Sequence, residues 1–454
     1  MGKVSAIVEQ GKASAPSASL LADADLARTI AWREGAAIAA NDFLAEVLAL
    51  AAQLPTAEYA INLCEDRYLF LVAFCAVAVA GKTNLLPASR APQAIAEVMQ
   101  AYPHTYVLSD QSLDPAPVRF FRVLPFCGKV DFLPPPVPVI ALEQVVAIGF
   151  TSGSTGTPKA NPKTWGSLCA SSALNAQLLC RDGAPNVVAT VPPQHMYGLE
   201  MSILLPLRSR AAIHTGHPFF PADVAHALAD VPAPRMLVTT PFHLRALIRE
   251  NISLPPLAAI VSATAPLEAE LAERVECRHA TVVLEMFGST ETCVIAQRRT
   301  AHGHAWQLYP GIELHPQPDG TLVIAPHFAE PTLLQDIVEL LPSREFMLRG
   351  RNSDLLEIAG KRASLGDLTH RLLAIPGVTD GVVFQLDADS SGVCRLAALA
   401  VANGVREADI LAALRVAVDP VFLPRPLRLV SALPRNGAGK LPRDALLAAL
   451  SCGL

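Results

Sequence analysis

The chain has 454 residues, of which 51% are hydrophobic and 17% charged, and its formal net charge is −5. This length exceeds the size at which a single hydrophobic core usually stops growing, so two or three domains are expected. No basic block is present to neutralise phosphates, which argues against a nucleic-acid partner. The longest apolar run, Tyr68–Ala80, is shorter than the ~20 residues of a membrane span, and we interpret it as a buried helix.

The start of the chain and the cysteines indicate where the protein resides. Residues 1–20 are rich in Ser, Ala and Gly and lack the apolar stretch of a signal peptide, so we expect a disordered tail. The nine cysteines occur singly, with no CxxC pair. Reduced thiols in a cytoplasmic protein are therefore expected.

From about Tyr59, β-branched runs alternate with Ala- and Leu-rich helical stretches. This alternation predicts an α/β fold in which parallel sheets are flanked by helices. The strands predicted in this part are Tyr59–Cys64, Thr83–Leu86, Tyr106–Ser109, Val145–Phe150, Val187–Val191, Ala211–His214, Met236–Thr239, Ala258–Ser262 and Val282–Met286. The helices predicted between them include Pro92–Gln100 and Leu168–Cys180, the latter capped by Thr164.

The pattern changes near Arg351, where shorter elements and charged turns begin. We place a domain boundary there, with a large domain over 21–351 and a smaller α+β domain over 352–454. The elements predicted in the smaller domain are helices at Asp367–Leu373 and Glu407–Val418 and strands at Val378–Gln385 and Leu396–Val401.

A loop dense in glycine and hydroxyl residues follows the strand that ends at Phe150. Glycines let backbone N–H groups approach an oxyanion, hydroxyls donate to phosphate oxygens, and a lysine adds positive charge. The residues expected to hold a triphosphate are Thr151, Ser152, Gly153, Ser154, Thr155, Gly156 and Lys159. The loop does not match GxxxxGK[ST], so it is no Walker A loop; a surface linker is the alternative.

This stretch resembles the phosphate-binding signature of the adenylate-forming superfamily, which includes acyl-CoA synthetases, peptide-synthetase adenylation domains and luciferases. Further motifs in the family's order extend the resemblance over about residues 145–445. The resemblance implies that ATP and Mg²⁺ are used to activate a carboxylic acid, and that the loop holds the pyrophosphate end of ATP. It also implies that the smaller domain is mobile.

Three further segments of the large domain carry the resemblance. His195, in Pro192–Gly198, matches a histidine that borders the acyl tunnel, although a core histidine is the alternative. Ser262–Leu267 resembles the segment that lies against adenine, through Ala263, Thr264 and Ala265, although the family's glycines are Ala263 and Thr264 here. In Glu285–Glu291, the resemblance places Phe287 and Gly288 at adenine, Thr290 at the α-phosphate and Glu291 on Mg²⁺.

The remaining motifs lie around the domain boundary and near the C-terminus. Asp336 and Arg351 match residues that contact ribose or phosphate, and Ser353 occupies the hinge position, where the family has an aspartate. A surface acid is the alternative for Asp336. Lys440, between Gly439 and Leu441, matches the lysine that bridges the attacking carboxylate and the α-phosphate; a solvated lysine is the alternative.

The resemblance predicts an acid–thiol ligase that forms an acyl-adenylate and passes the acyl group to a phosphopantetheine thiol. The acyl pocket is expected to be mostly apolar and to suit an aryl or medium-chain acid, with His195 beside Tyr197, Leu199, Ser262 and Met286. No acid occurs near Phe242–His243 to hold an α-ammonium group, which disfavours amino acids.

The acceptor of the acyl group is expected from a weaker resemblance. Pro158–Leu168, with Ala160 where most relatives have glycine, is similar to the ligases of bacterial aryl-polyene pathways, which implies an acyl carrier protein as the partner. A ligase that uses free CoA is one alternative. A non-catalytic nucleotide-binding relative is another, because several motif positions depart from the family.

Overall fold

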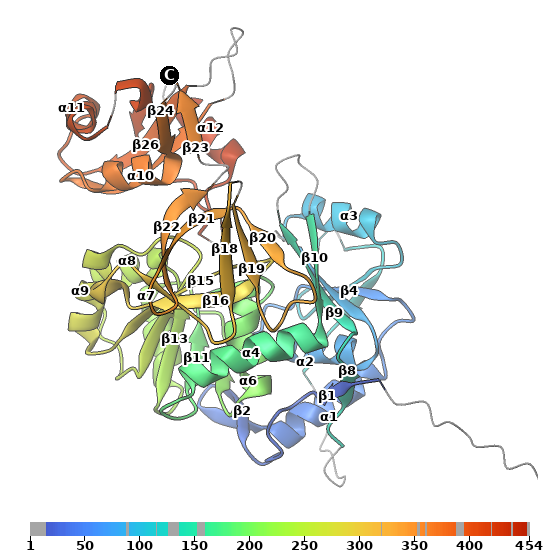
Figure 1. Ribbon diagram of the computed structural model, residues 1–454. Helices are drawn as coiled ribbons and strands as arrows, with labels where there is room; N and C mark the ends of the chain where they lie inside the picture. Colours follow the sequence, from blue (N-terminus) through green and yellow to red (C-terminus); the bar gives the residue numbers. More distant parts are fainter. Residues whose placement is uncertain are drawn as a thin grey trace, which may run out of the picture.

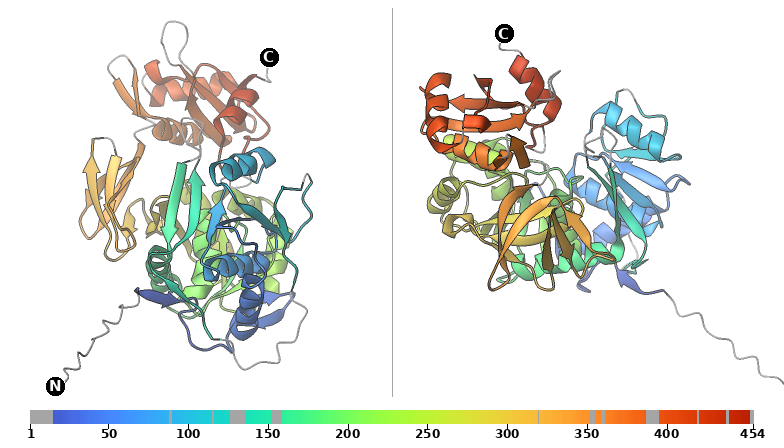
Figure 2. Two further views of the ribbon diagram at one scale, coloured as in Figure 1. Left: turned by 90° about the vertical axis from the view of Figure 1, so that its right-hand side faces the viewer. Right: turned by 45° about the horizontal axis from the view of Figure 1, so that its top comes forward.

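The computed structural model describes residues 15–87, 90–114, 116–125, 136–151, 159–318, 320–351, 355–358, 361–386, 395–418, 420–436 and 439–451, with backbone alone at 351, 355–358, 361–364 and 367. A small C-terminal domain lies over one end of a large domain (Figure 1). Figure 2 shows that the small domain keeps to the end opposite strand β1 (Ser17–Ser19). Among the described residues, no helix is long and apolar enough to cross a membrane.

An eleven-stranded mixed sheet forms the larger half of the large domain. Its middle strands, from β2 through β15, are parallel, whereas the strands after β15 join it antiparallel. The strands in spatial order are β21 (Asp336–Leu341), β22 (Glu345–Arg351), β17 (Trp306–Leu308), β16 (Cys293–Arg298), β15 (Val283–Ser289), β14 (Ala259–Ser262), β13 (Arg235–Thr239), β11 (Asn186–Ala189), β12 (Ala212–His214), β2 (Thr29–Arg33) and β3 (Ala36–Ala39).

A six-stranded sheet forms the other half. Its strands in spatial order are β10 (Lys159–Thr164), β9 (Val145–Thr151), β5 (Thr83–Leu86), β4 (Tyr59–Asn62), β6 (Tyr106–Ser109) and β7 (Phe120–Arg122). Only β10 runs antiparallel to its neighbour. Two short antiparallel sheets complete the domain: β1 with β8 (Val139–Ala141), and β18 (Glu313–Gln317) with β19 (Gly320–Ile324) and β20 (Thr332–Leu334).

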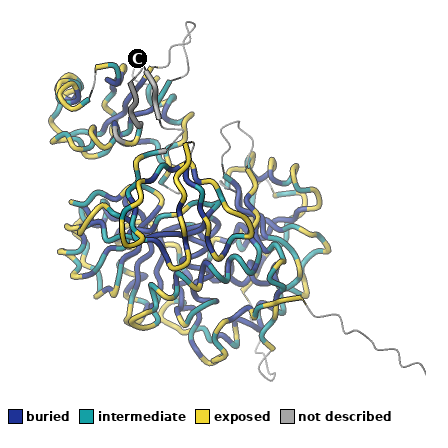
Figure 3. Tube along the Cα trace, viewed as in Figure 1, coloured by how far each residue is buried: buried dark blue, intermediate teal, exposed yellow. Residues whose placement is uncertain are grey.

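Helix α2 (Arg67–Val79) lies between the two large sheets, in contact with β4 and β5 on one side and β12 on the other. The carboxylate of Asp66 caps it by accepting from the N–H of Leu69 at 2.8 Å. All but the last of its residues are buried, which explains the continuous apolar run in the sequence (Figure 3). The other helices of the large domain are α1 (Ala40–Ala51), α3 (Pro92–Ala101), α4 (Trp165–Leu179), α5 (Met196–Leu199), the π-helical turn η1 (Glu200–Leu204), α6 (Leu205–Arg208), α7 (Pro221–Ala229), α8 (Pro241–Arg249), α9 (Ala269–His279) and the 3₁₀ turn η2 (Thr300–His302).

The small domain has its own core beneath a three-stranded sheet. The sheet order is β25 (Val378–Gln385), β26 (Leu396–Ala402) and β27 (Leu427–Leu429), and a hairpin of β23 (Leu355–Ile358) and β24 (Lys361–Ser364) precedes it. Its helical elements are α10 (Leu365–Leu373), α11 (Glu407–Ala417), the 3₁₀ turn η4 (Pro420–Phe422) and α12 (Arg443–Ser451).

The α/β fold with a smaller α+β domain is confirmed, and two details differ from expectation. The tail does not extend to residue 20, because β1 pairs with β8 and Leu20 is fully buried. The glycine-rich loop leads into strand β10 rather than directly into a helix, so β9 and β10 form a hairpin ahead of α4. Pro162 interrupts no ladder there because β10 is an edge strand.

Candidate active site

Several of the predicted site residues lie at or near the carboxyl ends of strands in the two large sheets. In open α/β sheets, ligands bind beyond the carboxyl ends of the strands. Thr151 ends β9, Ser262 ends β14, and Phe287 and Gly288 lie near the end of β15. His195 follows β11 and begins α5. Residues far apart in the sequence thus share one edge of the fold.

The hairpin of β9 and β10 carries the two ends of the glycine-rich loop. Thr151 pairs with Lys159 across the hairpin, whereas Ser152, Gly153, Ser154, Thr155 and Gly156 lie outside the described residues. A Cβ at Gly149 would lie 2.8 Å from Cγ2 of Thr290, so the hairpin touches the segment expected at the α-phosphate. Glycine is required there by this close approach.

The segment 289–294, which carries Thr290 and Glu291, is held by three buried charged or polar side chains. The ammonium of Lys163, on β10, donates to the carbonyl of Glu291 at 2.5 Å. Nε2 of His327 lies 2.8 Å from the carbonyl oxygen of Thr292. The carboxylate of Glu200 accepts from the N–H of Val294 at 3.1 Å. These contacts fix the backbone from the carbonyl of Glu291 to the N–H of Val294.

The carboxylate of Glu291 is half-buried and has no hydrogen bond or ion pair among the described residues. No group of three or more metal-ligating side chains occurs in the part of the chain that the structure describes. Mg²⁺ takes one or two protein carboxylates and completes its shell with water and phosphate oxygens. A single carboxylate beside a phosphate loop therefore fits this ion.

The adenine segment begins at Ser262, whose hydroxyl is fully buried and lacks a hydrogen-bond partner among the described residues. A buried polar atom of this kind is normally satisfied, so it fits a site that a polar ligand completes. Thr264 has a φ of 77°, the left-handed conformation that a glycine would adopt without strain. Ala263 is buried, and Ala265 follows in the same segment.

Phe287 is supported from behind by two aromatic rings. Its ring lies 5.3 Å from that of Trp306 and 5.6 Å from that of Phe346, measured between centroids. The buried carboxylate of Glu285 accepts from Arg298 at 2.7 Å and from the N–H of Leu267 at 3.0 Å. This network joins the adenine segment to β15 and makes Phe287 part of a rigid wall.

The acyl-pocket residues lie between α5 and the strand ends. The hydroxyl of Tyr197 donates to the carbonyl of Val261 at 2.9 Å. Leu199 is fully buried in the main core. The sulfur of Met286 lies 3.5 Å from the hydroxyl of Tyr309. The described side chains are thus mostly apolar; the hydroxyl of Tyr197 is engaged, whereas that of Ser262 has no hydrogen-bond partner among the described residues.

His195 is a titratable group among the residues predicted for the site. Burial, together with the positive charges of Lys440 and Arg90, lowers the pKa of His195 to about 4. The imidazole is therefore neutral at pH 7. The charge of Lys440, on the small domain, contributes to this lowering of the pKa.

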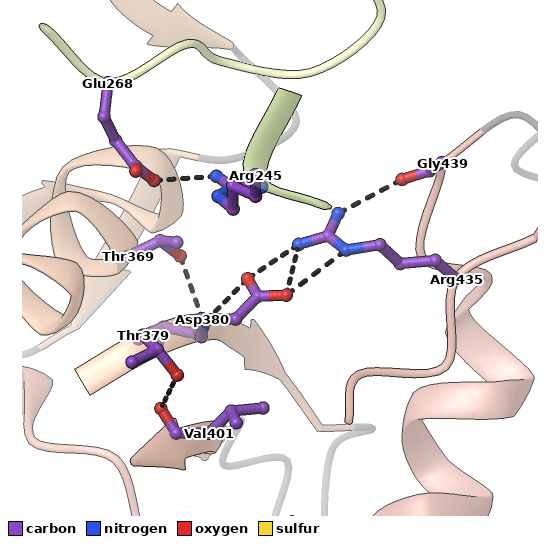
Figure 4. A network of polar contacts seen from close by, with 10 residues as sticks. Arg245, Glu268, Thr369, Thr379, Asp380, Val401, Arg435 and Gly439 are labelled. Carbon is purple, nitrogen blue, oxygen red and sulfur yellow. Dashed lines mark hydrogen bonds and ion pairs between the residues drawn. The ribbon is translucent and has the colours of Figure 1, made fainter. Parts of the chain in front are cut away.

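The loop that carries Lys440 is braced within the small domain (Figure 4). The guanidinium of Arg435 forms a bidentate pair with Asp380 on β25, with the shortest contact at 2.8 Å. Nη1 of Arg435 also donates to the carbonyl of Gly439 at 3.1 Å. Asn436 closes the turn by accepting from the N–H of Lys440 at 2.9 Å.

The residues expected at the ribose lie farther along the large sheet. Asp336 is buried and pairs with Arg351 across β21 and β22, at the end of the large domain. The side chain of Arg351 is outside the description, as is the hinge position Ser353. Their roles stay predictions.

Lys163, Glu200, His327 and Gly149 are site residues that the sequence motifs did not identify. One signal was present for Lys163: along β10, Asn161 and Lys163 are buried while the residues between and before them are exposed. A buried lysine two residues from a buried asparagine, on an edge strand beside a phosphate loop, indicates an inward-facing polar pair.

The sequence of this chain matches the family model for AMP-binding enzymes over residues 37–318. It is 31% identical to a 4-coumarate–CoA ligase of Rhodobacter capsulatus over 305 residues, which are 66% of this chain and 75% of the relative. A sulfoacetate–CoA ligase of Cupriavidus necator is 25% identical over 69% of this chain and 68% of the relative.

Solved structures of the same fold cover nearly the whole chain. One is o-succinylbenzoate CoA synthetase from Bacillus subtilis in complex with an acyl-adenylate, with a TM-score of 0.79 and 18% identity over 95% of this chain and 98% of that chain. Another is ATP-bound MatB from Rhodopseudomonas palustris, with a TM-score of 0.78 and 18% identity over 94% of this chain and 96% of that chain. With the family model matched over more than half of its length, the chain belongs to the AMP-binding enzymes.

Proposed function

We propose that the protein is an AMP-forming acid–thiol ligase. The observation that carries this proposal is the contact between the β9–β10 hairpin and the segment that holds Thr290 and Glu291: Gly149 lies against Thr290, and Lys163 donates to the carbonyl of Glu291. A cation, a hydroxyl and a carboxylate are the groups that phosphoryl transfer at an α-phosphate requires.

In the first half-reaction, a carboxylate oxygen of the acid attacks the α-phosphorus of ATP, and the bond from that phosphorus to pyrophosphate breaks. Lys440 neutralises charge on the approaching carboxylate and the α-phosphate, and Thr290 donates to a phosphate oxygen. Thr151 and Lys159, with the loop between them, hold the leaving pyrophosphate. Glu291 would hold Mg²⁺, which would supply further neutralisation of the phosphate charge when bound.

Adenosine binding is assigned to the wall of the site. Phe287 and Gly288 would lie along the adenine together with Ala263, Thr264 and Ala265. Asp336 would accept the ribose hydroxyls, with Arg351 beside it.

In the second half-reaction, a thiol attacks the acyl carbon and AMP leaves with the bonding electrons. Rotation of residues 352–454 about Ser353 would withdraw Lys440 and admit the thiol; hinges are commonly formed by a few residues at element ends. Neutral His195 would line the acyl tunnel, since a charged imidazole would be costly to bury there.

The acid is proposed to be an aryl or medium-chain carboxylic acid. The mostly apolar wall of Tyr197, Leu199 and Met286 favours an apolar acyl group. Relatives named 4-coumarate–CoA ligase and indoleacetate–CoA ligase act on aryl acids by their names.

For the acceptor, the named relatives favour free CoA, since these are called CoA ligases. The run Pro158–Leu168 favours a second candidate, the phosphopantetheine arm of an acyl carrier protein, by its similarity to aryl-polyene ligases. Both acceptors present the same thiol arm.

The test is acid-dependent release of pyrophosphate from ATP and Mg²⁺ over a panel of benzoates, cinnamates and fatty acids. Each acid is offered with CoA, with a phosphopantetheinylated carrier protein and with neither. Release with one acid class and thioester formation with one acceptor are expected. If ATP binds but no acid causes release of pyrophosphate, the protein is a non-catalytic nucleotide-binding relative and the proposed ligase activity is wrong.

A further inference from the structure

A buried cluster of charged and polar side chains lies directly behind the segment 289–294. Lys163 is 6% exposed and Glu200 is 1% exposed. The two come from different elements, β10 and η1, and meet on the side of the segment that faces the core. Burying a charge costs free energy unless the charge is paired and hydrogen-bonded. Each of these two side chains should therefore have partners that compensate for its burial.

Glu200 is fully satisfied by groups other than Lys163. Its carboxylate accepts from the hydroxyl of Ser171 at 2.6 Å, from the amide of Asn175 at 3.1 Å and from the N–H of Val294. Burial raises the pKa of Glu200, and these hydrogen bonds and the charge of Lys163 oppose the rise. Lys163 therefore compensates the charge of Glu200 from a distance, without a direct hydrogen bond.

The hydrogen bond that Lys163 does make, within the described residues, goes to the carbonyl of Glu291. A lysine whose role was only to neutralise Glu200 would not need this contact. Donation to that carbonyl fixes the peptide plane that follows Cα of Glu291, and thus restricts where its side chain can point. Thr292, the next residue, is held through its own carbonyl by His327.

We propose that Lys163 is a positioning residue that aims the carboxylate of Glu291 at a magnesium ion bound with ATP. This inference rests on the proposed function. Groups behind a metal ligand orient it, and their loss typically weakens metal binding or activity 10- to 100-fold. Lys163 acts from a strand that continues directly from the phosphate loop, so it couples the loop that holds pyrophosphate to the carboxylate that holds the ion.

The test measures binding, which does not require the acid to be known. The affinity of the purified full-length chain for ATP is measured by calorimetry with Mg²⁺ and with EDTA. For Lys163→Met, we expect Mg²⁺-ATP to bind roughly tenfold more weakly, with binding in EDTA unchanged within about twofold. Lys163→Arg keeps a donor and is expected to restore most of the Mg²⁺ effect.

Lys82 provides a matched control. Its ammonium also donates to backbone carbonyls, of Pro55 at 2.7 Å and Ala57 at 2.6 Å, far from the site. Lys82→Met should lower the melting temperature without changing the Mg²⁺ dependence. A Lys163→Met protein that differs from the wild type only in melting temperature would overturn the inference, because the lysine would then be purely structural.

Two further variants separate the possible explanations. If the only role of Lys163 is to compensate the charge of Glu200, the double variant Lys163→Met with Glu200→Gln should regain the wild-type affinity for Mg²⁺-ATP. We expect that it does not. Glu291→Gln removes the proposed Mg²⁺-binding carboxylate itself and gives the loss of affinity for Mg²⁺-ATP with which Lys163→Met is compared. A loss in Glu291→Gln without one in Lys163→Met contradicts this inference alone, whereas wild-type binding that does not depend on Mg²⁺ overturns the proposed function with it.

Discussion

Two lysines of the proposed site are held in opposite ways. Lys163 is buried on a strand of the large domain and is fixed by a carbonyl, whereas Lys440 is exposed on a loop of the small domain. A compact ammonium on a flexible stem suits a residue that must arrive and leave. The contrast fits the proposal that the large domain is preorganised for nucleotide and metal and that the small domain delivers the charge that starts the reaction.

The largest effect is expected at the delivered lysine. Lys440→Ala should lower acid-dependent exchange of pyrophosphate into ATP by roughly 10²–10³-fold, because a cation at the developing charge is lost. Transfer of the acyl group from a preformed acyl-adenylate to the thiol should be retained, and it serves as the control. An equal loss in both half-reactions would contradict the assignment of Lys440 to the first.

A substitution that crowds Thr290 in the large domain should have the next largest effect on the rate of pyrophosphate exchange. Gly149→Ala places a methyl group 2.8 Å from Cγ2 of Thr290 and 3.5 Å from Cε of Met196. Thr290 must shift, so the rate of pyrophosphate exchange should fall about tenfold, in keeping with the sensitivity of reactions to small misplacements.

Gly303→Ala is the matched control for this crowding, because its added Cβ meets no atom within 4 Å. It should leave the exchange rate unchanged. An unchanged rate in Gly149→Ala as well would mean that Thr290 does not need its present position.

The brace behind Lys440 should matter less. Asp380→Asn weakens the bidentate pair with Arg435 and loosens the carbonyl contact to Gly439 (Figure 4). We expect exchange to slow roughly threefold, since Lys440 would sample more positions while keeping its charge. Asp409→Asn breaks a similar but exposed pair with Arg406 on α11 and should have no effect on the exchange rate. Equal rates for the two variants would show that the brace has no part in delivery.

The smallest expected effect is on stability at acid pH. Burial lowers the pKa of His195 and of His243 to about 4, against about 6.5 in the unfolded chain. Between these values the unfolded state binds more protons, so stability is complete above about pH 6.5 and is lost as the pH falls toward 4. The melting temperature should drop by roughly a few degrees across this window.

His243→Gln should flatten this dependence, as measured by thermal unfolding between pH 4 and 7. The exposed His226 is the control: His226→Gln should leave the slope unchanged. A His243→Gln protein with the full slope would show that other groups produce it.

The sequence predicted the framework well because local patterns determine it. The strands β4, β5, β6, β9 and β11 to β15 follow from β-branched runs, and the side chain of Thr164 caps α4 as expected, accepting from the N–H of Ser167 at 3.1 Å. The motif residues could be proposed because each belongs to a short contiguous pattern, and their roles stay predictions. Strand β10 was missed because Asn161 and Pro162 are poor strand formers, and the pairing with β9 overrides that preference.

The groups behind the motif residues could not be predicted in this way. Three side chains contact the segment 289–294 from positions more than 30 residues away along the chain: Glu200, His327 and Lys163. Only the fold brings them to this segment. No local pattern encodes such contacts. The left-handed conformation of Thr264 was equally hidden, because threonine gives no sign that the position requires a positive φ.

The most direct test of adenylate formation follows an isotope. The acid that the panel identifies is labelled with ¹⁸O in its carboxylate and turned over with ATP, Mg²⁺ and the thiol. If the carboxylate attacks the α-phosphorus, one labelled oxygen leaves with AMP, and mass spectrometry should find AMP heavier by one ¹⁸O per turnover. Unlabelled AMP would contradict an acyl-adenylate and with it the assignment of Lys440, Thr290 and Glu291.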